Sequence, residues 1–166
     1  MDDPRRRALW YFAYGSNLNR SIFVERRKMQ ALDVRWGWLH DYGLRFNIPV
    51  GQGERGVANI EPEPGARICG ALYLLDPDVF DRLDRTEGVH MELYCRVPVE
   101  VITDAGETIG ALAYQSSLTT LGRKPSPRYM GLILDGAREH GLPPEWLAFL
   151  ERFELALDER GPDSRA

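Results

Sequence analysis

The aromatic run Trp10–Tyr14 and the turn Gly15–Asn17 that ends it constrain the fold more than any other stretch of this chain. The run is apolar and carries no charge, which favours a buried strand over a helix. Glycine permits a sharp turn because it has no Cβ, and Arg20–Gln30 has the pattern of an amphipathic helix. A strand, a glycine turn and a helix start gather backbone N–H groups that attract negative charge. The same pattern is also typical of an ordinary strand–helix corner, so the turn alone does not assign a function.

The middle of the chain is predicted to form strand after strand instead of regular strand–helix units. About six strands with inserted helices favour a mixed, mostly antiparallel sheet that curls into a small barrel, with helices packed outside, an α+β fold. The predicted strands after the first run are Ala31–Leu39, Leu44–Ile48, Val57–Pro62, Arg67–Leu75, Leu93–Thr103 and Thr108–Ser116. The predicted helices after the first are Pro77–Glu87, Arg128–His140 and one that begins at Pro143.

The segment Gly51–Gly56 matches the dinucleotide-binding pattern G-x-G-x-x-G, but we reject that interpretation. The pattern works only when its last glycine begins a helix whose N-terminus holds a pyrophosphate. Here the strand-like Val57–Pro62 follows, so a connection between strands is predicted instead.

The 166 residues predict one domain at 9–157, between a disordered arm at 1–8 and a polar tail at 158–166. A net charge of −4 gives no reason to expect nucleic acid as a partner. The chain has no apolar stretch near the ~20 residues that span a bilayer and no signal-peptide pattern. We therefore expect a cytoplasmic protein without a membrane partner, in which Cys69 and Cys95 are reduced and packed.

Glu87 is the most informative residue of the predicted helix Pro77–Glu87. Phe80 and Leu83 mark its apolar stripe, and helical spacing continues that stripe to Glu87. Glutamate is rare on a buried face, and both burial and the negative end of the helix dipole disfavour its charged form. Such a carboxyl group can take up and return a proton. The alternative is a frayed last residue that reaches solvent or an arginine.

Three separated segments together resemble the γ-glutamylcyclotransferase family, in the AIG2-like superfamily. They are Tyr11–Leu18, Leu83–Val89, and Pro125–Tyr129 with the following Gly136–Pro143. Their order and spacing agree with the family across Leu9–Trp146.

This resemblance implies the mixed barrel described above and a reaction that needs no cofactor and no metal. The α-amine of a small γ-glutamyl substrate attacks its own γ-carbonyl, which gives 5-oxoproline and a free amine, with Glu87 as general base and then acid. The resemblance thus implies a transferase of the 5-oxoproline-forming kind, an acyltransferase or lyase, that acts in glutathione metabolism. The implied substrate-binding residues are Tyr11, Phe12, Ala13, Tyr14, Gly15, Ser16, Asn17 and Leu18 of the glycine turn, together with Tyr114, Tyr129 and Tyr94.

Several alternatives remain open at this level. The leaving group could be an amino acid or an amine, as in γ-glutamylamine cyclotransferases, or the chain could remove a γ-glutamyl protecting group in a biosynthetic pathway. A non-catalytic small-molecule binding module is the rival class. The N–H groups of the glycine turn could hold either the α-carboxylate or the oxyanion. The sequence leaves the oligomeric state open, a homodimer included.

Overall fold

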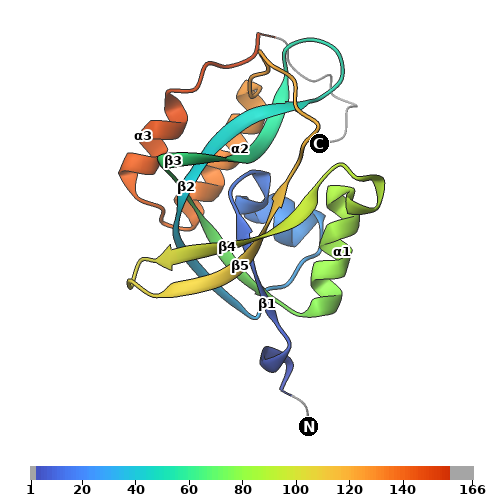
Figure 1. Ribbon diagram of the computed structural model, residues 1–166, viewed down its shortest axis with the longest axis vertical. Helices are drawn as coiled ribbons and strands as arrows, with labels where there is room; N and C mark the ends of the chain where they lie inside the picture. The colour runs from blue at the N-terminus through green and yellow to red at the C-terminus, as the bar shows by residue number, and fades with distance from the viewer. Residues whose placement is uncertain (1–2, 158–166) are drawn as a thin grey trace.

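The computed structural model describes residues 3–157 of the chain. Five strands close into a barrel in the order β1–β3–β2–β4–β5 (Figure 1). β1 is parallel to β5, and the other neighbouring strands are antiparallel, which confirms the predicted fold class. The strands are β1 (Leu9–Ala13), β2 (Asp33–Pro49), β3 (Gly56–Leu75), β4 (Cys95–Thr103) and β5 (Thr108–Gln115).

The helices lie outside the barrel, with α1 on one side and α2 and α3 on another (Figure 1). α1 has the predicted bounds because local signals fix both its ends: the Asp76 carboxylate accepts the Asp78 N–H, and Gly88 ends the helix with a φ of 71°. The α-helices are α1 (Pro77–Glu87), α2 (Pro127–Glu139) and α3 (Pro144–Glu151). The short helical turns are η1 (Pro4–Arg6), η2 (Ser16–Leu18), η3 (Ser21–Arg26) and η4 (Val89–Met91).

β2 and β3 form one long hairpin, which corrects the sequence prediction of four shorter strands in these segments. The register of the hairpin shifts between His40 and Tyr42, where Asp41 has a φ of 64°. The Asp41 carboxylate accepts the Gly65 N–H at 3.0 Å and fixes this irregularity. The half of the hairpin nearer the β1 side closes the barrel, while its tip extends beyond the barrel toward α2 (Figure 1).

The predicted helix Arg20–Gln30 is in fact the six-residue π-helix η3. Phe23 and Met29 are almost completely buried, and the Phe23 ring stacks on Tyr73 at 4.2 Å between centroids. These apolar contacts hold the segment against the barrel, and the wider π turn accommodates the polar residues between them.

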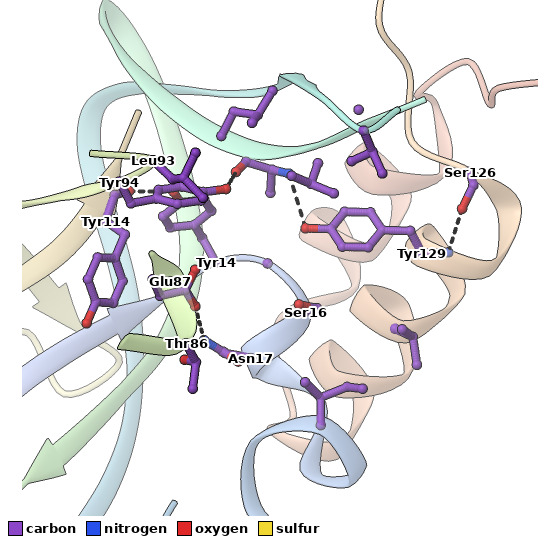
Figure 2. A pocket seen from close by; sticks show the side chains of 18 of the residues that line it. Tyr14, Ser16, Asn17, Thr86, Glu87, Leu93, Tyr94, Tyr114, Ser126 and Tyr129 are labelled. Atoms are coloured by element: carbon purple, nitrogen blue, oxygen red, sulfur yellow. Dashed lines mark hydrogen bonds between the residues drawn. The ribbon is translucent and has the colours of Figure 1, made fainter. Parts of the chain in front are cut away.

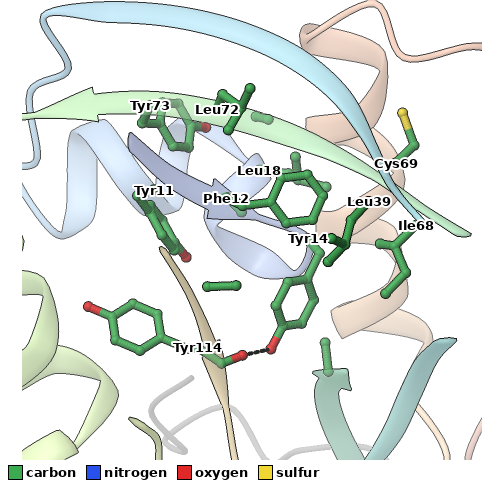
Figure 3. Close-up of a cluster of buried hydrophobic side chains, with 14 of the residues drawn as sticks. Tyr11, Phe12, Tyr14, Leu18, Leu39, Ile68, Cys69, Leu72, Tyr73 and Tyr114 are labelled. Carbon is green, nitrogen blue, oxygen red and sulfur yellow. Dashed lines mark hydrogen bonds between the residues drawn. The ribbon is translucent and has the colours of Figure 1, made fainter. Parts of the chain in front are cut away.

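The barrel core surrounds β1, whose residues pack against β3 and η2 (Figure 3). Phe12 and Leu18 are completely buried there, and Tyr14 donates a hydrogen bond to the Tyr114 carbonyl. α2 approaches η2 closely at Gly136, where a Cβ would lie 2.5 Å from the Leu18 carbonyl carbon. The glycine turn is therefore held between the core and α2.

The two cysteines differ, which corrects the prediction that both are packed. Cys69 is buried, and burial raises the pKa of its thiol to about 12. Cys95 is a free thiol at the surface, with Sγ 3.4 Å from the Gln115 carbonyl oxygen.

The predicted tail at 158–166 lies outside the described residues, as do the first two residues of the predicted arm. The described part of that arm contains η1, whose side chains are exposed. Within residues 3–157 no helix is long and apolar enough to span a membrane, and no group of three or more His, Cys, Asp or Glu side chains is placed to hold a metal ion.

Candidate active site

A pocket of about 410 Å³ lies beside the glycine turn, where β1 gives way to η2 (Figure 2). The last turn of α1, η3, the tip of the β2–β3 hairpin, the segment before β4, β5 and the region around the start of α2 contribute the other lining residues. Segments that are far apart in the sequence thus meet at one site.

Glu87 lies at this pocket with its side chain 14% exposed, although helices commonly fray at their last residue. Its Oε1 accepts two hydrogen bonds, from Asn17 Nδ2 at 3.0 Å and from Arg27 Nη1 at 2.8 Å. The Asn17 amide also donates to the Tyr11 hydroxyl at 2.9 Å. The carboxyl group is therefore fixed by an ion pair and an amide. Glu87 is half-buried, whereas Phe80 and Leu83 are the buried residues of α1, and its side chain reaches an arginine, as the alternative in the sequence analysis allowed.

Arg27 was not singled out by the sequence analysis, and its contact changes the expected electrostatics. The sequence analysis considered burial and the helix dipole, whereas the structure adds a guanidinium 2.8 Å from the carboxylate. No sequence signal distinguishes Arg27 from the neighbouring basic residues Arg26 and Lys28.

The pocket is also lined by tyrosines whose hydroxyl groups stay protonated. Burial is the main cause that raises the pKa of Tyr11, Tyr14, Tyr94 and Tyr114, and it raises the pKa of Tyr129 to about 12. The negative charge of Glu87 acts in the same direction on all five. These hydroxyls can orient groups by hydrogen bonding, but they are not bases near neutral pH.

Two of the tyrosines hold the hairpin tip in place from opposite sides. Tyr94 donates to the Ala58 carbonyl at 2.9 Å, and the Tyr129 hydroxyl accepts the Ala58 N–H at 3.1 Å (Figure 2). A third, Tyr114, donates to Asp84 at 2.6 Å. The tyrosines therefore tie the hairpin to α2 and to the segment before β4, and they tie β5 to α1.

The glycine turn presents its first N–H groups before the helical bonding of η2 begins. The first bond of η2 joins the Leu18 N–H to the Gly15 carbonyl at 3.0 Å. The backbone N–H groups of Ser16 and Asn17 precede this bond and have no partner within the turn. Fewer N–H groups of the turn can therefore bind a ligand than the sequence predicts, because the Leu18 N–H already donates to the Gly15 carbonyl. Gly15 is needed for close approach, since a Cβ there would lie 3.2 Å from Ala58 Cβ and 3.3 Å from the Tyr129 hydroxyl.

The opposite side of η2 is held by a second buried hydrogen-bond network. The Tyr73 hydroxyl donates to the Asn17 carbonyl at 2.9 Å, and His140 Nε2 lies 3.0 Å from the Leu18 carbonyl. Burial lowers the pKa of His140, so the ring is neutral at pH 7. Both carbonyls are thereby fixed on the side away from the pocket, which orients the peptide units of the turn.

The structure brings most of the predicted site residues together and places three elsewhere. The side chains of Phe12, Ala13 and Leu18 are buried in the core and do not line the pocket. The predicted residues that do line it are Glu87, Tyr11, Tyr14, Gly15, Ser16, Asn17, Tyr94, Tyr114 and Tyr129.

The sequence analysis missed the basic residues of the pocket. Arg26, Arg27, Arg55 and Arg128 all line it. Arg55 lies within the rejected glycine pattern, and Arg128 begins the predicted helix Arg128–His140, so only the fold shows that they converge. Among the described lining residues Glu87 is the one carboxylate, and neither histidine nor cysteine is present.

The arrangement can therefore move a proton at one carboxylate, beside hydrogen-bond donors and positive charge. It cannot support thiol chemistry, since Cys69 and Cys95 lie outside the lining residues. This agrees with the reaction that the family resemblance implies.

Comparisons with known proteins support that resemblance. Residues 67–150 match the model of the AIG2-like family. The γ-glutamylcyclotransferase of Bos taurus is 33% identical over 148 residues, which cover 87% of this chain and 78% of the relative. The Homo sapiens protein of the same name is 31% identical and is aligned over 91% of this chain and 81% of its own length. A solved structure described as a γ-glutamyl cyclotransferase superposes with a TM-score of 0.82 at 27% identity, covering 93% of this chain and 92% of the other. The chain therefore belongs to the AIG2-like, γ-glutamylcyclotransferase family.

Proposed function

We propose that this protein converts γ-glutamyl amino acids into 5-oxoproline and the free amino acid, with Glu87 as the catalytic proton carrier. The observation that carries the proposal is the single carboxylate among the described residues that line the pocket, held at the end of α1 beside the glycine turn. A γ-glutamyl substrate contains both its nucleophile and its electrophile, so the protein needs only to fold it and to move protons.

The proposed reaction begins when Glu87 takes one proton from the α-ammonium group of the substrate. The α-nitrogen attacks the γ-carbonyl carbon, a C–N bond forms, and the carbonyl oxygen becomes an oxyanion. Glu87 returns its proton to the leaving nitrogen, and the original C–N bond breaks. The ring nitrogen loses a second proton, which the leaving amine takes up, so two protons move in total.

The surroundings of Glu87 support this course of events. The N–H groups of Ser16 and Asn17 are suited to an anionic group, and the protonated hydroxyl of Tyr129, which accepts the Ala58 N–H, lies along the same pocket. A proton donor that stays protonated can bind the carboxylate or the oxyanion without competing with Glu87 for the proton.

The basic residues of the pocket support an amino acid over a simple amine as the leaving group. An amino acid carries a carboxylate, which the positive charges of Arg55 and Arg128 attract. Ile48, Pro49 and Val57 line the same region and offer apolar contact to a side chain. The same arginines would repel a leaving group that carries a positive charge.

The test is an assay of 5-oxoproline release by the wild-type protein across three substrate groups: γ-glutamyl amino acids, γ-glutamyl amines and glutathione. We expect turnover of γ-glutamyl amino acids with the highest kcat/KM. A preference for γ-glutamyl amines would instead favour the γ-glutamylamine or protecting-group alternative. Binding without any product across the panel would favour the non-catalytic module.

A further inference from the structure

We propose that Arg27 is a positioning residue for Glu87: it fixes one carboxylate oxygen so that the other faces the substrate, and it supplies the counter-charge of that carboxylate. This inference depends on the function proposed above for the same pocket. It assigns a role to a residue outside all three segments that carry the family resemblance.

The first observation is how the hydrogen bonds of Glu87 are divided between its two oxygens. Arg27 Nη1 and Asn17 Nδ2 both donate to Oε1, at 2.8 and 3.0 Å. Within residues 3–157, Oε2 accepts no hydrogen bond, and it points away from Asn17 (Figure 2). A carboxylate held at one oxygen presents the other in a fixed direction, which is the geometry that proton transfer from a bound ammonium group requires.

The second observation is the unusual backbone that places Arg27. Its N–H bonds to the Ile22 carbonyl five residues earlier, at 2.9 Å, as the C-cap of the π-helix η3. Lys28 follows with a φ of 57°, and the Met29 N–H then reaches the Phe23 carbonyl at 3.0 Å. Both a π turn and a positive φ at a residue other than glycine cost energy and concentrate at functional sites.

The third observation is the set of charged and titratable groups that face Glu87. Asp84, on the same helix, is paired with Arg96 and accepts the Tyr114 hydroxyl. Arg85 is exposed. The tyrosines whose hydroxyls interact with the charge of Glu87 are Tyr11, Tyr14, Tyr94, Tyr114 and Tyr129.

Among the described residues, the cation in contact with the Glu87 carboxylate is Arg27. Both side chains of the pair are mostly shielded from water, with 20% of Arg27 and 14% of Glu87 exposed. Removing the guanidinium leaves a shielded carboxylate without its counter-charge, and uptake of a proton relieves that cost. The variant would thus have less of the unprotonated carboxylate at low pH, and it would lose the fixed direction of Oε2.

The experiment compares Arg27→Gln with the wild-type protein, using pH profiles of kcat and KM for 5-oxoproline release. We expect kcat at pH 7 to fall by about 10- to 100-fold, with KM changed less than about threefold. The acid limb of the profile should move to higher pH by about one unit. Arg27→Lys keeps the charge and should restore the position of the acid limb, with only part of kcat.

The matched control is Arg85→Gln, which removes the same charge from the helix that carries Glu87 but lies outside the pocket lining. It should leave the acid limb in place. If Arg27→Gln raises KM instead and leaves kcat and the acid limb unchanged, Arg27 binds the substrate carboxylate and the proposal is wrong.

A measurement without substrate separates this proposal from the proposed function. In protein with ¹³C-labelled glutamate carboxyl groups, the Glu87 signal is assigned by Glu87→Gln and titrated by NMR. Its midpoint should lie at higher pH in Arg27→Gln than in the wild-type protein. Equal midpoints would overturn the role of Arg27 even if the enzyme turns over, whereas an inactive wild-type protein would refute the function alone. If Arg27→Gln fails to fold, the same comparison is made with Arg27→Lys: an unchanged midpoint with lower kcat supports the proposal, and a raised KM alone overturns it.

Discussion

The two walls of the pocket are built in different ways. The wall formed by η2, η3 and the last turn of α1 consists of polar side chains that bind one another directly, as Asn17 and Arg27 bind Glu87; it is called the catalytic wall here after the role proposed for Glu87. The opposite wall, here the hairpin wall, is formed by residues 48–50 and 55–58. Backbone bonds hold it to the loop before α2, with Gly56 N–H to the Lys124 carbonyl at 2.8 Å and Lys124 N–H to the Glu54 carbonyl at 2.7 Å.

This difference suggests that the catalytic wall carries out the reaction and that the hairpin wall selects the substrate. Side chains on the catalytic wall have little freedom, because each is fixed by several partners and a small displacement disturbs all of them. Side chains on the hairpin wall extend from a backbone frame that can carry other residues without disturbing Glu87. Substitutions on the catalytic wall should therefore affect kcat for every substrate, and those on the hairpin wall should affect KM selectively.

Gly15→Ala should have the largest effect among the substitutions that test this division. The added Cβ would lie 3.2 Å from Ala58 Cβ and 3.3 Å from the Tyr129 hydroxyl, so the turn or its neighbours must shift by a few tenths of an ångström. We expect kcat/KM to fall by about 100-fold for all substrates, since misplacement of this order weakens oriented catalysis. Steady-state kinetics with two or more γ-glutamyl substrates measures the effect.

The control for Gly15→Ala is Gly110→Ala in β5, where an added Cβ has no atom within 4 Å. Its kinetics should match the wild type. A substrate-dependent loss in Gly15→Ala would show that the glycine turn contributes to selection, against the division proposed here.

Arg55→Gln should have a smaller and selective effect. If its charge attracts the leaving carboxylate, KM for γ-glutamylalanine should rise by about tenfold, which is the expected size of one charge-assisted contact. γ-Glutamylethylamide has the same length without a carboxylate, so its kcat/KM should change less than about twofold. Equal losses on both substrates would contradict a carboxylate contact and would indicate a structural role for Arg55.

The features of the fold and of the pocket that could be predicted from the sequence are those fixed by residues close together in the chain. The bounds of α1 were predictable because Asp76, Pro77 and Gly88 act on neighbouring residues. The position of Glu87 in the last turn of α1, in line with Phe80 and Leu83, was predictable from helical spacing. The glycine turn was recognised because its residues are contiguous in the chain.

Features that depend on distant contacts could not be predicted. The continuity of β2 through Asp41 depends on its bond to Gly65, and the length of η3 depends on packing against Tyr73. The approach of Arg27 to Glu87 spans 60 residues and requires the π turn. Convergence of the pocket arginines likewise requires the closed barrel, since nothing in their local sequences relates Arg55 to Arg128.

Replacement of Glu87 by glutamine tests the central claim most directly. Glutamine keeps the size and the hydrogen bonds of the side chain but cannot take up a proton near neutral pH. We expect Glu87→Gln to fold with an unchanged circular dichroism spectrum, to bind a γ-glutamyl substrate in calorimetry, and to lose at least about 10³-fold in the rate of 5-oxoproline release. Release of 5-oxoproline at the wild-type rate by this variant would contradict the central claim.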